Sequence, residues 1–223
     1  MKVIVAGGSG FVGGEVIRQA IADEKITQIF ALTRKSLPED LTKSEKVTAI
    51  QHQDFLVYPP ELLAQLAGAE ACFWSLGGRA YQFPDVETAK KVSVDFTVAA
   101  AKAFVEVLAP QLPESKKFRF VFCSGKWAEW DQDKNLSFFK DTRRIKGLVE
   151  KELCDVADAN KDRFEVWAVR PSVITKKYPT LVNGLMVHTM GSIPVDHLAK
   201  AMLKIAFEGY KDHIIEYEAL LKI

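Results

Sequence analysis

Glycines at positions 7, 10 and 13 give a G-x-x-G-x-x-G spacing near the start of the chain. An apolar run with strand character (residues 1–6) precedes them, and a helical pattern (residues 14–21) follows. A strand, a glycine turn and a helix amino-terminus together favour a pyrophosphate, because backbone N–H groups can approach the phosphates. A structural turn without a ligand is the alternative. The residues expected at the phosphates are Gly7, Gly8, Ser9, Gly10, Phe11, Val12 and Gly13.

The residue that ends the second strand carries information about the nucleotide. This strand, over residues 26–33, ends at Thr33 and is followed by Arg34 and Lys35. No acidic residue lies at its end. An acid here would bind the ribose 2′-hydroxyl of NAD, whereas an arginine suits the 2′-phosphate of NADP. We therefore expect NADP(H), with Arg34 on the phosphate and Thr33 adding a hydroxyl contact. A solvated surface arginine, or Lys35 in its place, is the alternative.

Strand and helix patterns alternate along the whole chain, which is typical of an α/β protein with a doubly wound parallel sheet. We expect a three-layer αβα Rossmann architecture. Strand-like runs occupy residues 1–6, 26–33, 47–52, 71–76, 118–124, 164–169 and 214–220, and helical spacings occupy residues 14–21, 61–66, 85–108, 138–160 and 194–207.

Length and composition are those of an ordinary globular domain. The chain has 223 residues, 48% of them hydrophobic and 26% charged. There is no internal repeat or linker, so we expect one domain over residues 1–223. Loops at 77–84, 125–137 and 172–192 are expected to form a small cap on the substrate side.

Charge and cysteine content argue against several classes of function. The net charge of +1 gives no field that would attract nucleic acid or an acidic membrane surface. No stretch has the length of a membrane span, and the first strand leaves no room for a signal peptide. Three cysteines and four histidines lack metal-ligand spacing, so we expect no metal and a cytoplasmic location.

Further candidates follow the other strands, because ligands of such sheets lie beyond the carboxyl ends of the strands. Asp54 is a candidate for the adenine amino group, with Phe55 packing nearby, although Asp54 could equally cap a turn. Ser75, Leu76 and Gly77 would let backbone pass beside the ribose, or would simply end the strand.

The pattern resembles the short-chain dehydrogenase/reductase superfamily, and within it the atypical branch of Tat-interacting-protein-like and NmrA-like proteins. The resemblance covers nearly the whole chain. It rests on residues 5–13 (VAGGSGFVG), 32–34 (LTR), 73–77 (FWSLG), 122–124 (FCS), 146–150 (KGLVE), 169–171 (VRP) and 193–199 (IPVDHLA).

The resemblance implies a catalytic serine, tyrosine and lysine, of which this chain has two. Ser124 matches the serine, which polarises a carbonyl, and Lys146 matches the lysine, which also binds the nicotinamide ribose. The tyrosine position holds Thr142, whose hydroxyl is a far weaker acid than a phenol with its reference pKa of about 10. Pro171 is expected near the nicotinamide.

Three explanations of Thr142 stay open. Another proton donor, Tyr81, Tyr178 or His188, stands in for the tyrosine. Alternatively, the protein binds NADP(H) without turnover, as NmrA-like redox sensors are thought to do. The third is a redox-neutral isomerisation or cyclisation on the same fold. The first makes the protein an NADP(H)-dependent reductase of a small carbonyl compound, and this is the main hypothesis.

Aromatic residues follow Ser124 and the fourth strand. Trp127 and Trp130 lie in one expected loop, and Tyr81 and Phe83 in the other. Such residues can wall an apolar pocket for an aromatic ligand, or simply cover the end of the sheet. The helices at 85–108 and 138–160 are the surfaces through which many relatives dimerise, so a homodimer is a further expectation.

Overall fold

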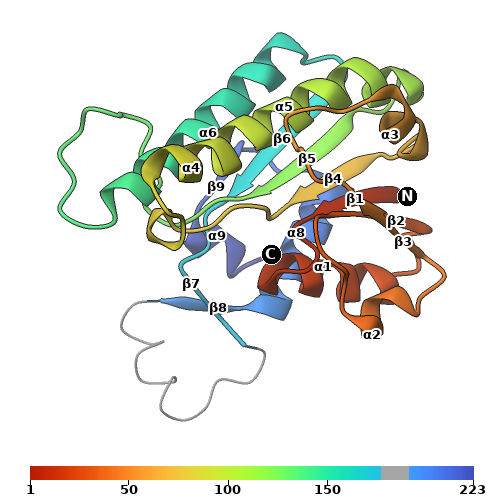
Figure 1. The fold of residues 1–223 in the computed structure, drawn as a ribbon, viewed down its shortest axis with the longest axis horizontal. Coiled ribbons are helices and arrows are strands. Elements are labelled where there is room, and N and C mark those ends of the chain that lie inside the picture. The colour runs from red at the N-terminus through yellow and green to blue at the C-terminus, as the bar shows by residue number, and fades with distance from the viewer. Residues whose placement is uncertain (177–190) are drawn as a thin grey trace.

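A seven-stranded, fully parallel sheet forms the centre of the molecule (Figure 1). The computed structural model describes residues 1–176 and 191–223. The strand order is β3-β2-β1-β4-β5-β6-β9, which confirms the expected doubly wound fold. The strands are β1 (Lys2–Ala6), β2 (Gln28–Thr33), β3 (Val47–Gln51), β4 (Ala71–Trp74), β5 (Phe118–Cys123), β6 (Phe164–Val169) and β9 (Ile214–Ile215).

Helices cover both faces of the sheet and complete three layers (Figure 1). One face packs against α1 (Phe11–Ala22), α2 (Glu39–Thr42), α8 (Val195–Glu208) and α9 (Tyr217–Leu220). The other packs against α3 (Pro60–Gln65), α4 (Val86–Lys90), α5 (Phe96–Ala103) and α6 (Lys140–Ala159). Because both faces are covered, the central strands are continuous apolar runs rather than alternating ones.

The long helix expected at residues 85–108 is interrupted by two π-helical segments. Lys91–Asp95 lies between α4 and α5, and Phe104–Leu108 follows α5. The apolar face nevertheless stays on the sheet, since Phe96, Ala100 and Phe104 are all buried. Apolar periodicity therefore predicted the position of the helix but not its changes in winding.

The chain after β6 differs from expectation in two places. The region 172–192, expected to be irregular, contributes β7 (Val173–Thr175) and β8 (Ser192–Pro194), which pair in parallel. The prediction of a strand over residues 214–220 is wrong beyond Ile215, where β9 ends. The chain turns into α9 because Tyr217 and Leu220, one helical turn apart, both bury their side chains against the sheet.

The order of the strands reverses its direction beside β1. The chain winds outward from β1 in one direction to β2 and β3, and in the other direction it continues through β4. In sheets of this order, ligands bind at such a reversal, beyond the carboxyl ends of the strands. The glycine turn follows β1, and residues 75–77 follow β4, so both sequence candidates lie at these strand ends.

We predict that Phe104→Ala lowers the free energy of unfolding by about 3–5 kcal/mol. Phe104 is fully buried, and its ring contacts those of Tyr58, Phe118 and Phe120. Phe138→Ala is the matched control, because Phe138 is 44% exposed and its loss should cost well under half as much. Urea unfolding measures both, and equal losses would contradict the described core.

Candidate functional site

The glycine turn presents unpaired backbone N–H groups at the start of α1. Gly10 is the N-cap and offers no side chain to the first helical turn, which also contains no acidic residue. The turn is closed by the Gly10 N–H, which donates to the Gly7 carbonyl oxygen at 2.9 Å. The first N–H groups of α1 are thus left for an external anion.

Close approach of two segments explains why glycine occupies the turn. Gly7 has φ +86, a conformation that side chains disfavour. A side chain at Gly13 would overlap the Gly7 carbonyl and would lie 2.7 Å from Ser75 Oγ. The Ser75 hydroxyl in turn donates to the Ala6 carbonyl at 3.0 Å, joining the end of β4 to the end of β1. This cradle fits a pyrophosphate.

Arg34 is held at the end of β2 by its neighbours' backbone and stays exposed. The Thr33 hydroxyl donates to the Lys35 carbonyl at 2.5 Å and accepts from the Lys35 N–H, so it shapes a tight turn around Arg34. Gln53 Nε2 donates to the Arg34 carbonyl at 3.0 Å. The guanidinium makes no ion pair within the described residues.

The structure gives Asp54 and Phe55 different surroundings. Asp54 is exposed and its Oδ1 accepts from the Leu56 N–H at 3.0 Å, so it caps the turn after β3. Phe55 is fully buried, with its ring packed against those of His52, Trp74 and Phe96. Phe55 therefore cannot pack against a bound adenine, because its side chain belongs to the core.

A buried carboxylate organises the other half of the site. Glu150 of α6 is fully buried, and its oxygens accept from Ser124, Trp130 and Arg170. Arg170, at the end of β6, makes a two-pronged ion pair with Glu150 and also contacts Glu216 at 2.7 Å. Burial disfavours the guanidinium charge, but the two carboxylates outweigh this and raise the pKa of Arg170.

Ser124 is tied to Glu150 rather than left free to polarise a ligand. Its hydroxyl donates to Glu150 Oε1 at 2.5 Å, and its backbone N–H donates to the Val169 carbonyl. A serine hydroxyl carries a single proton, so Ser124 faces any ligand only as an acceptor. The sequence pattern identified residues 146–150 as family-like but gave no sign that Glu150 would bind Ser124.

Lys146 and Thr142 lie one turn apart on α6, beside the end of β5. Lys146 Nζ donates to the Cys123 carbonyl at 3.0 Å and lies 4.8 Å from the centre of the Phe122 ring. Thr142 Oγ1 accepts the Ala80 N–H at 2.8 Å, which fastens a short 3-10 helix (Ala80–Gln82) to α6. Thr142, at the position of the family's tyrosine, thus attaches the loop at Ala80 to α6.

The other expected donors lie less favourably or are not described. Tyr81 is 62% exposed, and its hydroxyl accepts from Arg79 at 2.7 Å on the outside of the loop. Tyr178 and His188 lie outside the described residues. Pro171 is buried, and its carbonyl accepts the Lys126 N–H at 2.8 Å.

The loop after Ser124 is fixed to α6 at several points. The Glu129 N–H donates to the Arg143 carbonyl, and Arg143 Nε donates to the Trp127 carbonyl at 2.8 Å. Gly147 allows this approach, because any side chain there would overlap the Glu129 carbonyl. Gly147 is therefore a packing residue whose role the sequence motif did not reveal.

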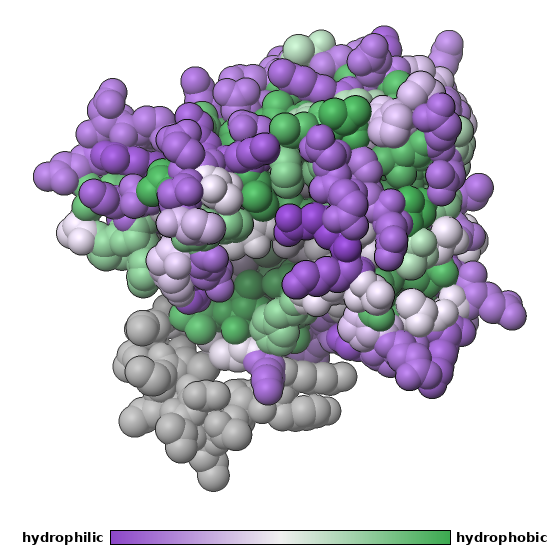
Figure 2. Space-filling model, in the orientation of Figure 1, coloured by the Kyte–Doolittle hydropathy of each residue, from purple (hydrophilic) through white to green (hydrophobic). Residues whose placement is uncertain are grey.

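Exposed aromatic residues form the rim of this loop. Trp127 and Phe138 pack edge to face at 5.4 Å, and Trp127 and Phe139 both have positive φ, at 64° and 48°. Such strain in bulky residues persists only where surrounding contacts impose it. Figure 2 shows hydrophobic surface among mostly hydrophilic side chains on this face of the molecule.

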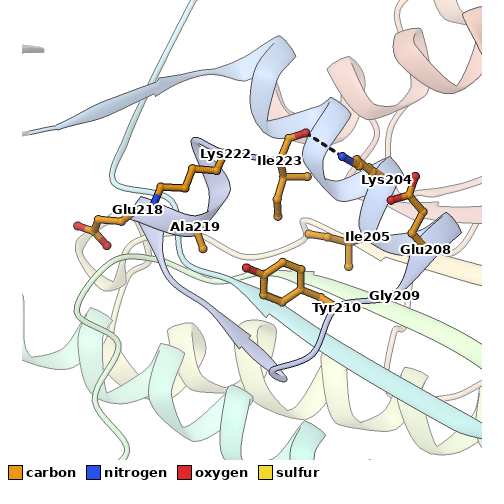
Figure 3. A pocket seen from close by; sticks show the side chains of 9 residues that line it. All are labelled: Lys204, Ile205, Glu208, Gly209, Tyr210, Glu218, Ala219, Lys222 and Ile223. Carbon is orange, nitrogen blue, oxygen red and sulfur yellow. Dashed lines mark hydrogen bonds between the residues drawn. The ribbon is translucent and has the colours of Figure 1, made fainter.

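A pocket of about 400 Å³ lies between the end of α8 and α9, separate from this site (Figure 3). None of its lining residues belongs to the glycine turn, the end of β2 or residues 124–150. Lys204 Nζ donates to the Ile223 carbonyl at 3.4 Å across its edge. The lining residues are Lys204, Ile205, Glu208, Gly209, Tyr210, Glu218, Ala219, Lys222 and Ile223.

Within residues 1–176 and 191–223, no cluster of acidic, histidine or cysteine side chains is suited to a metal ion. No helix in the same ranges is long and apolar enough to cross a membrane. The cysteines Cys72, Cys123 and Cys154 are all free thiols, and burial raises the pKa of each.

Comparison with known proteins identifies the family. The sequence model of a protein family described as NAD(P)H-binding matches residues 7–208, which is most of the chain. The chain belongs to the NAD(P)H-binding family. The glycine cradle at β1 is therefore part of an NAD(P)H-binding Rossmann fold.

Similar proteins include enzymes of several kinds. A biosynthetic protein of Purpureocillium lilacinum, leucinostatins biosynthesis cluster protein T, is 31% identical over 121 residues, which are 54% of this chain and 42% of that protein. Vestitone reductase from alfalfa has a TM-score of 0.69 at 18% identity, covering 96% of this chain and 76% of that one.

Two further structures share the fold. Gre2 from Candida albicans, in complex with NADPH, has a TM-score of 0.73 at 17% identity, covering 97% of this chain and 77% of that one. A UDP-N-acetylglucosamine 4-epimerase from Methanobrevibacter ruminantium has a TM-score of 0.68 at 14% identity, covering 96% and 75%. At these identities the likeness concerns the fold alone.

We predict that Glu150→Gln lowers the free energy of unfolding by about 3–5 kcal/mol, because it leaves the Arg170 charge partly unpaired in a buried place. Glu216→Gln is the matched control. It removes the other carboxylate on Arg170, but Glu216 is 50% exposed, so its loss should cost about 1 kcal/mol or less. Chemical unfolding compares the two, and similar losses would show that Glu150 is not the structural centre of the site.

Proposed function

We propose that this protein is an NADP(H)-dependent reductase that acts on a small carbonyl compound. The observation that carries the proposal is the glycine cradle with Arg34 beside it, exposed and without a carboxylate partner in the described chain. The nearest acid in sequence after β2, Glu39, pairs with Lys43. A guanidinium in this state suits a 2′-phosphate.

The proposed dinucleotide contacts involve the ends of β1, β2 and β4 and one residue of α6. Residues 7–13 would hold the pyrophosphate and Arg34 the 2′-phosphate, while Ser75, Leu76 and Gly77 would pass beside the ribose. Lys146 would bind the nicotinamide ribose, with Pro171 nearby. When bound, the reduced nicotinamide supplies a hydride to a carbonyl carbon.

The substrate is proposed to be aromatic. Trp127, Phe138 and Phe139 offer exposed rings on a loop that α6 holds in place, and rigid aromatic walls favour flat apolar ligands. The chain is proposed to form one domain over residues 1–223. A small cap on its substrate side would come from the loops at 77–84, 125–137 and 172–192. A cytoplasmic location and a homodimer complete the proposal.

Binding of NADP(H) without turnover is the second candidate, and Thr142 is the observation that favours it. Its oxygen accepts from Ala80, and it cannot provide the acidity of a phenol. A redox-neutral isomerase or cyclase is a third, since an epimerase shares the fold.

We predict that Arg34→Ala weakens NADPH binding about 10- to 100-fold and leaves NADH binding nearly unchanged. The loss corresponds to one or two charge-assisted hydrogen bonds of about 1.5–3 kcal/mol. Lys35→Ala is the control, because Lys35 is equally exposed and adjacent. Calorimetric titration gives both affinities. Equal weakening for the two dinucleotides would refute the assignment of Arg34.

We also expect the protein to oxidise NADPH when an aromatic aldehyde such as benzaldehyde is supplied. Loss of nicotinamide absorbance over time measures the reaction, and Lys146→Met should abolish it. NADPH binding without turnover across a panel of aldehydes and ketones would count against the reductase and favour the second candidate.

A further inference from the structure

The hydrogen bonds of the site decide which of its groups has a proton to give. Ser124 has one hydroxyl proton, and Glu150 Oε1 receives it at 2.5 Å. Glu150 is fully buried and is held by Arg170, so its carboxylate stays in place as the acceptor of this hydrogen bond. Ser124 is therefore unable to donate to a ligand oxygen unless its hydrogen bond to the Glu150 carboxylate breaks.

Of the other candidate hydroxyls in the described part of the chain, neither Thr142 nor Tyr81 replaces the missing phenol. Thr142 has its oxygen fixed on the Ala80 N–H, and an aliphatic hydroxyl is too weak an acid to release its proton. Tyr81 has a phenol, but the ring is 62% exposed and its oxygen is bound by Arg79. Tyr81 therefore lies on the surface of the loop, where its oxygen accepts from Arg79.

Among the candidates that the structure describes, Lys146 is the group that keeps protons available. Its ammonium has three N–H bonds, of which one goes to the Cys123 carbonyl at 3.0 Å. The Phe122 ring lies 4.8 Å from Nζ and offers no competing acceptor of ordinary strength. Lys146 is also held in place, since the next residue, Gly147, packs directly under the Glu129 carbonyl.

We propose that Lys146 itself donates the proton to the substrate oxygen, in the place of a tyrosine. The proposal rests on the reductase function proposed above. In this step the carbonyl carbon accepts a hydride from the reduced nicotinamide, and the carbonyl π electrons move to the oxygen. The Lys146 N–H bond breaks and gives that oxygen its proton, which leaves an alcohol and a neutral amine. Solvent then returns a proton to the amine.

The surroundings of Lys146 make its ammonium a stronger acid than usual. Burial lowers the pKa of Lys146, and the neighbouring Cys123 and Glu150 oppose part of this shift. Cys123 lies on β5 and Glu150 on α6, where Arg170 pairs with it. Reduction should therefore proceed at lower pH and fall as the pH rises through the pKa of Lys146, when the donor is lost.

The experiment compares Lys146→Arg with the wild-type protein. Arginine keeps the positive charge that binds a ribose but does not release its proton in the working pH range. NADPH binding, followed by its fluorescence, should stay within a few-fold of wild type, which also shows that the variant folds. Benzaldehyde reduction should fall at least about 100-fold at every pH. Adding Thr142→Tyr to Lys146→Arg supplies a phenol and should restore part of the rate.

A second readout does not depend on turnover. The rate at which acetic anhydride labels Lys146, measured by mass spectrometry across pH, reports the pKa of its amine. The proposal expects a midpoint below that of the exposed Lys140 on the same helix. A midpoint equal to that of Lys140 would overturn it.

The outcomes separate this proposal from the proposed function. If wild type reduces benzaldehyde and Lys146→Arg does so equally well, Lys146 is not the donor, while the reductase function stands. If wild type binds NADPH without reducing benzaldehyde and Thr142→Tyr alone creates the activity, both are overturned, and the protein is a cofactor-binding one. Loss of turnover in Lys146→Arg with NADPH binding retained supports the proposal.

Discussion

The site depends on one buried carboxylate. Removing the Glu150 charge from water costs several kcal/mol, and the protein recovers this only through the donors around it. These donors come from the end of β5 (Ser124), the end of β6 (Arg170) and the loop between β5 and α6 (Trp130). The end of β5 with its following loop and the end of β6 are thus joined to α6 by one side chain, and the position of α6, with Lys146 on it, follows from the same bonds.

The dinucleotide half of the site rests on a different constraint, which is steric. The glycine turn lies so close to the backbone after β4 that Gly7 has no space for a side chain, and Gly13 lies directly against the Gly7 carbonyl. This closeness follows from the sheet, in which β4 pairs directly with β1 while β2 lies on the other side. Backbone N–H groups and strand order together make an anion site at the glycine turn, and Arg34 and Lys35 add positive charge at the end of β2.

Local patterns in the sequence predicted the elements of the first half of the molecule correctly. The alternation of elements predicted the doubly wound sheet, and the run from β1 through the glycine turn to α1 follows from apolar strand, glycine spacing and helical periodicity. Tertiary contacts decided the rest. Phe55 follows a strand as a ligand residue would, yet the gap between Trp74 and Phe96 buries it. Ile214 to Leu220 is apolar enough for a strand, but only a helix places both Tyr217 and Leu220 on the sheet.

The hydrogen bonds of the site could not be predicted from the sequence, for a related reason. A motif identifies residue types, whereas the direction of a proton depends on which partner lies nearest. Ser124 matches a family position, but Glu150, 26 residues later, takes its proton. Thr142 differs from that family's tyrosine, and the oxygen it retains fixes the loop at Ala80. Because Ser124 and Thr142 have both become structural partners, the acid proposed at the end of β5 is, among the described residues, the ammonium of Lys146, whose charged form is destabilised by burial.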